Sequence, residues 1–213
     1  MKLYTYYRSS AAYRVRIALN LKGLTVDQIP VHLSRNGGEQ RTDAYREINP
    51  NALVPSLEDN GAVINQSLAI IEYLDEAYPQ VPLLPGSAAD RAHLRAIALT
   101  IACDIHPLQN LRVLTYLARE LHADEEARNT WFRHWVKNGL EAVERMVVRG
   151  KPGKFTVADT PTLADIFIVP QLANARRVNA DLSGMPTLLR IEANCQALPA
   201  FQRAAPGAQP DAE

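Results

Sequence analysis

The sequence predicts two differently built parts, a small mixed α/β domain over about the first 80 residues and an all-helical domain after it. In the first part, β-favouring runs and helix-period apolar patterns follow in the order strand, helix, strand, helix, hairpin, helix, which suits a small sheet with helices on its faces. Beyond Ser87, apolar residues recur at helical spacing without strand-like alternation. Between the two parts, Pro79, Pro82, Pro85 and Gly86 form a stiff linker.

The elements of the first part can be placed by their boundaries. The β-like runs span 2–7, 26–32, 53–57 and 62–64. One helical segment begins behind the serines at 9–10 and stops at 22–24, a second spans 42–48, and a third opens at 66–67 and ends at 78–79. Gly23 supplies a stop for the first helix, and Pro50 ends the second because proline disfavours helical geometry in the residue before it. The Asn60-Gly61 step predicts a hairpin. Pro55 cannot donate to a sheet ladder, so we expect it at a strand start or edge.

The second part is predicted as a series of helices. The apolar pattern runs from Ser87 to about Leu121, where Pro107 predicts a kink rather than a stop. A second long helix follows over 124–149, and another runs from Pro186 to about Ala197. The spacing of Thr162 and Asp165 is that of a capping box, which should start a buried helix. The Ala/Pro/Gly/Gln-rich tail after residue 203 has little to bury and is predicted to be a coil.

The composition excludes several classes of function. The 23 basic and 23 acidic residues cancel, so nothing favours nucleic acid or an anionic membrane as a partner. No apolar run approaches a membrane span and no signal peptide is evident, which places the protein in the cytosol. Cys103 and Cys195 are far apart and are expected to be ordinary buried residues, and no His or Cys spacing indicates a metal site. The expected partner is a small molecule.

The stretch that carries most chemistry is the turn after the first strand. Arg8, Ser9 and Ser10 stand where a strand passes into a helix. The first helical N–H groups have no intrahelical partner and the helix dipole adds partial positive charge, so such a turn can hold an anion or a thiolate. Arg8 adds a charge able to grip a carboxylate. The alternative is that one serine only caps the helix and Arg8 is solvated.

From Arg8 onward the run Arg-Ser-Ser-Ala-Ala-Tyr-Arg-Val-Arg-Ile-Ala-Leu resembles the active-site signature of zeta-class glutathione transferases, the family that includes maleylacetoacetate isomerase. The resemblance extends from Tyr4 to Pro210. It implies the glutathione transferase fold, with a thioredoxin-like glutathione-binding domain at 1–80, a linker at 81–87 and an all-helical substrate-binding domain at 88–213. Where this family usually has cysteine, the chain has Ala11, which points to the related glutathione-dependent maleylpyruvate isomerases.

The same resemblance implies roles for other residues of the first domain. It implies a cis Val54-Pro55 bond, with the main chain of Val54 left to pair with a peptide ligand. Gln66 and Ser67 resemble the pair that binds the γ-glutamyl carboxylate of glutathione, a role that suits a helix N-terminus. The alternative for Ser67 is simple capping. Gln40 resembles the residue that reaches the glycyl end of glutathione.

In the second domain, the segment from Ile105 to Leu111 resembles a family segment whose Gln-Asn pair, here Gln109 and Asn110, lies near the ligand. His106 replaces the glutamine most common there, so it either touches substrate or faces solvent. A further zeta-class segment places an arginine near the substrate; Arg177 takes that position and Arg176 is extra. The alternative is two solvated arginines at a helix C-terminus, where cations are favoured.

The implied function is a glutathione-dependent cis–trans isomerase that converts maleylpyruvate to fumarylpyruvate in aromatic (gentisate) catabolism. The catalytic candidates are Arg8, Ser9, Ser10, Arg176 and Arg177. The alternatives are maleylacetoacetate isomerase and a zeta-class transferase acting on haloacids. A non-catalytic transferase-like binding module is the alternative of another class, although such modules commonly lose the serine or the Gln-Ser pair that this chain keeps. The family also implies a homodimer.

Overall fold

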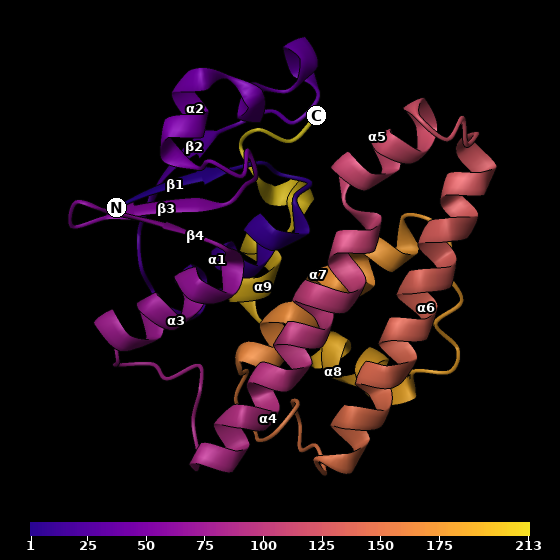
Figure 1. The fold of residues 1–213 in the computed structure, drawn as a ribbon. Helices are drawn as coiled ribbons and strands as arrows, with labels where there is room; N and C mark the ends of the chain where they lie inside the picture. Colours follow the sequence, from indigo (N-terminus) through magenta and orange to yellow (C-terminus); the bar gives the residue numbers. More distant parts are fainter. The chain divides into compact units, whose positions relative to one another are not determined.

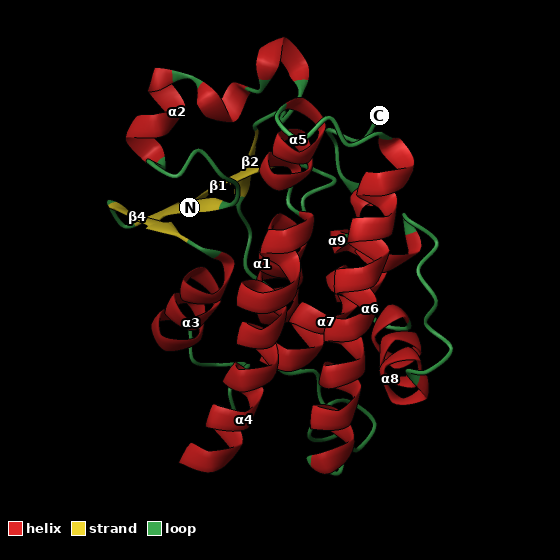
Figure 2. Cartoon of the chain, turned by 45° about the vertical axis from the view of Figure 1, so that its right-hand side comes forward, coloured by secondary structure: helices red, strands yellow, loops and turns green.

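The computed structural model describes residues 1–213 and divides the chain into two compact units (Figure 1). One unit contains Met1–Leu83 together with Gln196–Glu213, and the other contains Leu84–Cys195. All strands belong to the first unit, and the second is helical (Figure 2). This is the fold class that the sequence predicts. The division differs from the expected one at the C-terminus, where 196–213 packs with the first unit rather than with the helical one.

The first unit is built on a four-stranded mixed sheet. Its strands are β1 (Lys2–Thr5), β2 (Asp27–Pro30), β3 (Ser56–Asp59) and β4 (Ala62–Asn65), arranged in the order β2-β1-β3-β4. β1 and β2 are parallel, whereas β3 is antiparallel to both β1 and β4. The β3–β4 hairpin turns at Asn60-Gly61, where both residues have positive φ, as the dipeptide predicts.

Three helices from the first 80 residues cover this sheet. α1 (Ser10–Lys22) and α3 (Ser67–Ala77) lie on one face, and α2 (Asp43–Ile48) lies on the other (Figure 1). α1 ends at Gly23, which adopts the left-handed conformation that its position requires. The apolar residues of the α1 and α3 faces are fully buried, among them Val15, Ile17, Ile70 and Leu74. Burial of these side chains stabilises the unit.

The C-terminal segment completes the first unit. α9 (Pro199–Ala204) lies beside α1, and Phe201 is fully buried. Arg16 donates to the carbonyl of Ala204 at 3.0 Å and Asn20 donates to that of Ala200 at 2.9 Å. A short 3-10 turn, Pro206–Ala208, follows α9. This turn is the only regular element beyond α9, so the predicted coil holds for the rest of the tail, whereas the packing of 196–213 with the first unit was not predicted.

The second unit begins with a helix that Pro107 interrupts more strongly than expected. α4 (Ala88–Leu99) passes into a π-helical turn at Thr100–Ile105 and a 3-10 turn at His106–Gln109 before α5 (Leu111–Arg119) begins. The predicted continuous, kinked helix is therefore wrong. Pro107 has no N–H to donate to the preceding turn, and Asn110 has extended backbone angles and starts a new helix.

Three further helices form the rest of the second unit. α6 (Glu125–Arg149) starts at Asp124, whose carboxylate accepts the N–H of Ala127 at 2.8 Å. α7 (Leu163–Arg176) is buried over most of its length, and α8 (Pro186–Gln196) follows it. Cys195 on α8 is buried, which raises the pKa of its thiol, but Cys103 is exposed, so the expectation that both are buried was half wrong. None of the helices combines the length and the apolar character needed to cross a bilayer.

The predicted capping box is present at the start of α7. The Asp165 carboxylate is fully buried and accepts four hydrogen bonds, from the N–H and hydroxyl of Thr156 at 2.9 and 2.6 Å and from those of Thr162 at 2.7 and 2.8 Å. The Asp165 carboxylate is thus the common acceptor for all four of these donors. The box therefore ties the loop before α7 to its first turn.

We expect Asp165→Asn to lower the free energy of unfolding by about 3 kcal/mol, because the new amide NH₂ would face two buried donors that then lack an acceptor. Urea denaturation measures this. Asp90→Asn is the matched control, since Asp90 closes the capping box of α4 on the exposed surface and its loss should cost much less. Equal losses in the two variants would contradict the role given to burial.

Candidate functional site

The register of the sheet brings four segments of the first unit to one end. Thr5 pairs with Pro30, Tyr4 with Ser56, and Ser56 with Asn65. The residues that follow β1, β2 and β4 and those that precede β3 therefore lie at the same end of the sheet. These are the turn 6–10, the loop 31–41, the dipeptide 54–55 and the dipeptide 66–67. All residues predicted for the first domain lie in these segments or, like Ala11, directly beside them.

Ser9 both caps α1 and keeps a proton to donate. Its Oγ accepts the N–H of Ala12 at 3.2 Å, and its own N–H donates to the carbonyl of Tyr6 at 3.0 Å. A serine hydroxyl has one proton and two lone pairs, so accepting this bond leaves the O–H for a ligand. Ser9 is partly accessible, whereas Ser10 is 6% exposed. The capping and ligand-binding interpretations of Ser9 are therefore compatible, and Ser9 is the accessible serine of the pair.

The turn before Ser9 is held by a buried guanidinium. Arg16 is 3% exposed and donates to the Thr5 hydroxyl at 3.1 Å and to the carbonyls of Tyr6 and Tyr7 at 3.3 and 3.0 Å. Burial lowers the pKa of Arg16 to about 10, so the side chain stays charged at neutral pH. Arg8 lies on the same turn and is exposed, and Ala11 lies in the first turn of α1.

The N-terminus of α3 forms a second polar site. Ser67 is 6% exposed, and its Oγ accepts from Nη1 of the buried Arg14 at 3.3 Å. Gln66 has φ 72°, a backbone conformation that non-glycine residues rarely adopt and that tends to occur at functional sites. Unpaired N–H groups, a serine hydroxyl and a guanidinium thus converge at one helix N-terminus, which is suited to a carboxylate.

The dipeptide before β3 has the conformation that the resemblance implies. The Val54-Pro55 bond is cis. The preceding carbonyl, that of Leu53, accepts hydrogen bonds from the Tyr45 hydroxyl at 2.8 Å and from the Asn49 amide at 2.7 Å. Asn49 is 2% exposed and lies directly before Pro50. These contacts hold the approach to Val54 in place.

Gln40 retains hydrogen-bonding capacity in the loop after β2. It lies in a 3-10 turn, Glu39–Arg41, is 6% exposed, and donates its amide N–H to the carbonyl of Leu33 at 3.3 Å. Its Oε1 is buried without a partner in the protein. Buried polar atoms are nearly always paired, so this oxygen indicates a polar ligand or water at the loop.

In the second unit, the predicted residues near Pro107 have different surroundings. Gln109 is 6% exposed, and both atoms of its side-chain amide are buried without a partner. Asn110 accepts the N–H of Arg112 at 3.1 Å through Oδ1 and therefore caps α5. His106 is half-buried. Capping accounts for Asn110, whereas no contact within the protein accounts for the amide of Gln109.

The two arginines at the end of α7 differ in their engagement. Arg176 forms a bidentate ion pair with Glu192 on α8, with both N···O distances at 2.5 Å. The Glu192 side chain is 8% exposed, and its hydrogen bonds raise the pKa of Arg176. Arg177 contacts the side-chain oxygen of Asn174 at 3.4 Å. Arg176 thus joins α7 to α8, and Arg177 holds the position for which the resemblance implies a substrate contact.

Comparison with known proteins identifies the family. Residues 3–82 match the model of the glutathione S-transferase N-terminal domain. A probable maleylacetoacetate isomerase of Vibrio cholerae is 50% identical over 210 residues, 99% of this chain and 97% of that protein. The chain belongs to the glutathione transferase family. Its zeta-class character follows from a holo structure of a bacterial zeta-class maleylpyruvate isomerase, which is 45% identical over all of both chains with a TM-score of 0.96.

A second structure of this zeta-class family carries ligands. A maleylacetoacetate isomerase of Methylobacterium extorquens, with bound malonate and glutathione, is 36% identical and covers all of both chains with a TM-score of 0.94. Both structures support the glutathione transferase fold of this zeta-class chain, as expected from its motifs.

Sequence reasoning missed three residues that support the zeta-class turn and the α3 N-terminus. Arg14 and Arg16 stand within the apolar run of α1, and a charge inside such a run signals a buried, paired guanidinium. Asp211, which contacts the turn before Ser9, had no such signal because it lies in a tail of low hydrophobicity. Only the folded chain brings it to the site.

Proposed function

We propose that this protein is a glutathione-dependent cis–trans isomerase of a maleyl-type oxo acid, with maleylpyruvate as substrate and fumarylpyruvate as product. The observation that carries the proposal is the Ser9 hydroxyl, which accepts a backbone N–H and so keeps its proton for a thiolate at the N-terminus of α1. A dicarboxylate oxo acid and glutathione are the expected partners, in the cytosol. We also propose that the protein is a homodimer, in line with the resemblance to its family.

The residues present fit glutathione. A tripeptide with two carboxylates and a thiol needs an anion site, main-chain and amide partners, and a thiolate site. Ser67 and the α3 N-terminus offer the first, with Gln66 beside them. The main chain of Val54 and the unpaired Oε1 of Gln40 offer the second. Ser9 and the α1 N-terminus offer the third, with Ser10 and Ala11 next to them.

When bound, glutathione supplies a thiol that adds reversibly to the cis double bond and makes rotation about it easy. The role of Ser9 is to hold the sulfur as a thiolate by donating its O–H, with help from the helix dipole, as such surroundings lower a thiol pKa. Arg8 and Arg177 would orient the substrate carboxylates and stabilise negative charge on its oxo group. Because residue 11 is alanine and not cysteine, the protein has no thiol of its own at this position beside the cofactor.

Maleylacetoacetate is the alternative substrate, favoured by the 50% identity to a probable maleylacetoacetate isomerase. The preference for maleylpyruvate is supported by Ala11 and by the full-length match to a maleylpyruvate isomerase. The extra Arg176, which would supply a further cation for a diacid, adds little support because it pairs with Glu192. Action on haloacids is the further alternative within the class.

The deciding experiment follows the loss of ultraviolet absorbance of each maleyl substrate, with and without glutathione, and identifies the fumaryl product. We expect turnover only with glutathione, and faster turnover of maleylpyruvate. Faster turnover of maleylacetoacetate would make that compound the substrate in place of maleylpyruvate. If neither fumaryl product formed while glutathione still bound, the haloacid transferase or the binding module would replace the isomerase.

Substitutions of Arg176 and Arg177 are expected to have different effects, the first on stability and the second on substrate binding. Arg176→Ala leaves the nearly buried Glu192 carboxylate without its bidentate partner, so we expect about 1 to 2 kcal/mol lower unfolding stability and nearly unchanged kinetics. Arg177→Ala should raise KM for maleylpyruvate by about 10-fold at nearly unchanged stability, since a charge-assisted contact is lost. Urea unfolding and steady-state kinetics measure both. A reversed pattern would assign the substrate contact to Arg176.

A further inference from the structure

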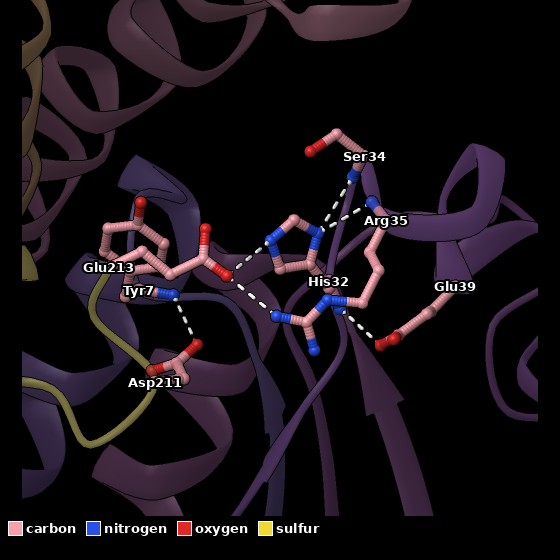
Figure 3. Close-up of polar contacts among 7 residues, drawn as sticks. All are labelled: Tyr7, His32, Ser34, Arg35, Glu39, Asp211 and Glu213. Atoms are coloured by element: carbon pink, nitrogen blue, oxygen red, sulfur yellow. Dashed lines mark hydrogen bonds and ion pairs between the residues drawn. The ribbon is translucent and has the colours of Figure 1, made fainter.

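The last residues of the chain lie against the turn that carries Ser9. One carboxylate oxygen of Asp211 accepts the backbone N–H of Tyr7 at 2.9 Å, across 204 positions of sequence (Figure 3). Gln209 anchors this segment: it is 6% exposed, and its amide donates to the carbonyls of Arg203 and Ala205, both at 2.8 Å. Asp211 is thus held in place by its own segment as well as by Tyr7.

Two side chains together hold both main-chain polar groups of Tyr7. Asp211 accepts its N–H, and Arg16 donates to its carbonyl at 3.0 Å. Arg16 also donates to the carbonyl of Ala204, so the guanidinium joins the turn to the C-terminal segment. The Asp211 carboxylate attracts the Arg16 guanidinium, which raises the pKa of that arginine against the effect of its burial.

The sheet does not hold this turn. β1 ends at Thr5, whose carbonyl accepts the N–H of Val31 at 2.7 Å as the last bond toward β2. The N–H of Tyr7 lies beyond the ladder and is paired by Asp211 instead. Ser9 follows two residues later, and its N–H is bonded to the carbonyl of Tyr6. The position of the Ser9 hydroxyl therefore depends on how Tyr6 and Tyr7 are held.

We propose that Asp211 is a positioning residue for Ser9: by accepting the N–H of Tyr7 it holds the turn so that the Ser9 hydroxyl and the α1 N-terminus meet the sulfur of glutathione. The inference rests on the proposed function for its catalytic consequence. Its structural part, the restraint on Tyr7, can be tested without glutathione.

Glu213 provides a matched control from the same segment. Its carboxylate lies 2.7 Å from Arg35 and 3.3 Å from Nε2 of His32 (Figure 3). The side chains of Glu213 and Arg35 are 54% and 58% exposed, and exposed ion pairs contribute little to stability. Glu213 makes no hydrogen bond to the main chain of the turn, so Glu213→Gln should leave Ser9 in place.

The first experiment measures hydrogen exchange of the Tyr7 amide in the full chain without ligand. We expect slow exchange in the wild type and in Glu213→Gln, and exchange at least about 10-fold faster in Asp211→Ala, where the acceptor is gone. Asp211→Asn retains an acceptor oxygen and should stay close to the wild type. Equally fast exchange in the wild type and Asp211→Ala would overturn the proposal. Urea midpoints confirm that each variant is folded.

The second experiment titrates the thiol of bound glutathione by its thiolate absorbance and measures kcat. Losing a negative charge would by itself lower the thiol pKa, whereas losing the position of Ser9 raises it, so the sign separates the two effects. For Asp211→Ala we expect a pKa raised by roughly one unit and a kcat lower by about 10-fold, with KM for glutathione changed less. Asp211→Asn should keep kcat within about threefold of the wild type.

The outcomes separate this inference from the function on which it rests. A wild type that neither binds nor ionises glutathione would overturn both. Ionisation that is equal in the wild type and Asp211→Ala, or a thiol pKa lowered in Asp211→Ala, would overturn the positioning role alone. A loss in Asp211→Asn as large as in Asp211→Ala would also overturn it, because the charge and not the hydrogen bond would then be what matters.

Discussion

Replacing Ser9 by glycine is expected to lower kcat of the glutathione-dependent isomerisation by about 10²- to 10³-fold, the cost of removing one well-placed donor to developing negative charge. The thiol pKa of bound glutathione should rise at the same time, because the hydroxyl no longer stabilises the thiolate. Steady-state kinetics and titration of the thiolate absorbance measure the two effects. Both follow from the position of the hydroxyl at the N-cap of α1.

Glycine is the informative substitution because Ser9 also caps the helix. Alanine at an N-cap costs about 1 kcal/mol of stability, but glycine costs only a few tenths. Ser9→Gly thus removes the donor with little loss of stability, and Ser9→Thr, which keeps a hydroxyl, should retain most of the activity. The buried Ser10 offers the comparison: a larger loss in Ser10→Ala than in Ser9→Gly would move the thiolate contact to Ser10.

Replacing Ser67 by alanine is expected to raise the Kd of glutathione by roughly 10- to 100-fold, which corresponds to losing one hydrogen bond to a charged carboxylate. Because the Ser67 hydroxyl accepts from Arg14, its own proton remains available to donate to a carboxylate. Once glutathione saturates the site, kcat should recover. Calorimetric titration with glutathione measures the affinity directly.

Ser87→Ala controls for the general cost of removing a serine at a helix start. Ser87 caps α4 in the helical unit, where its hydroxyl accepts the N–H of Asp90 at 3.3 Å. We expect a small loss of stability and an unchanged Kd for glutathione in this variant. A Kd that rises equally in both variants, or that stays unchanged in Ser67→Ala, would contradict an anion site at the α3 N-terminus.

Local signals predicted the elements that local physics controls. Asn60-Gly61 predicted a hairpin, Gly23 a helix end and Thr162 with Asp165 a capping box, and all three are present. Each depends on interactions between residues a few positions apart, so the sequence carries the information. Pro107 predicted a kink within one helix. Its missing N–H and the capping side chain of Asn110 end the helix there instead.

Candidate site residues could be proposed from the sequence where a motif and a helix N-terminus coincide. Ser9 and Ser67 stand at helix starts, so both their chemistry and their place follow from neighbouring residues. The contacts around the candidate residues could not be predicted from neighbouring residues. Arg14 supports Ser67 from another helix, Glu192 pairs with Arg176, and Asp211 accepts a hydrogen bond from the turn although it lies at the far end of the chain.

Local patterns in the sequence predicted the two-part fold and the strand–turn–helix that carries Ser9. They did so because periodicity, capping and turn chemistry act over a few residues. The folded chain was needed to show that Ser9 is the accessible serine, that Glu192 pairs with Arg176, and that residues 196–213 pack with the first unit. Those outcomes depend on burial and on hydrogen bonds between distant segments, and the spacing of residues along a chain does not encode which buried group will meet which partner.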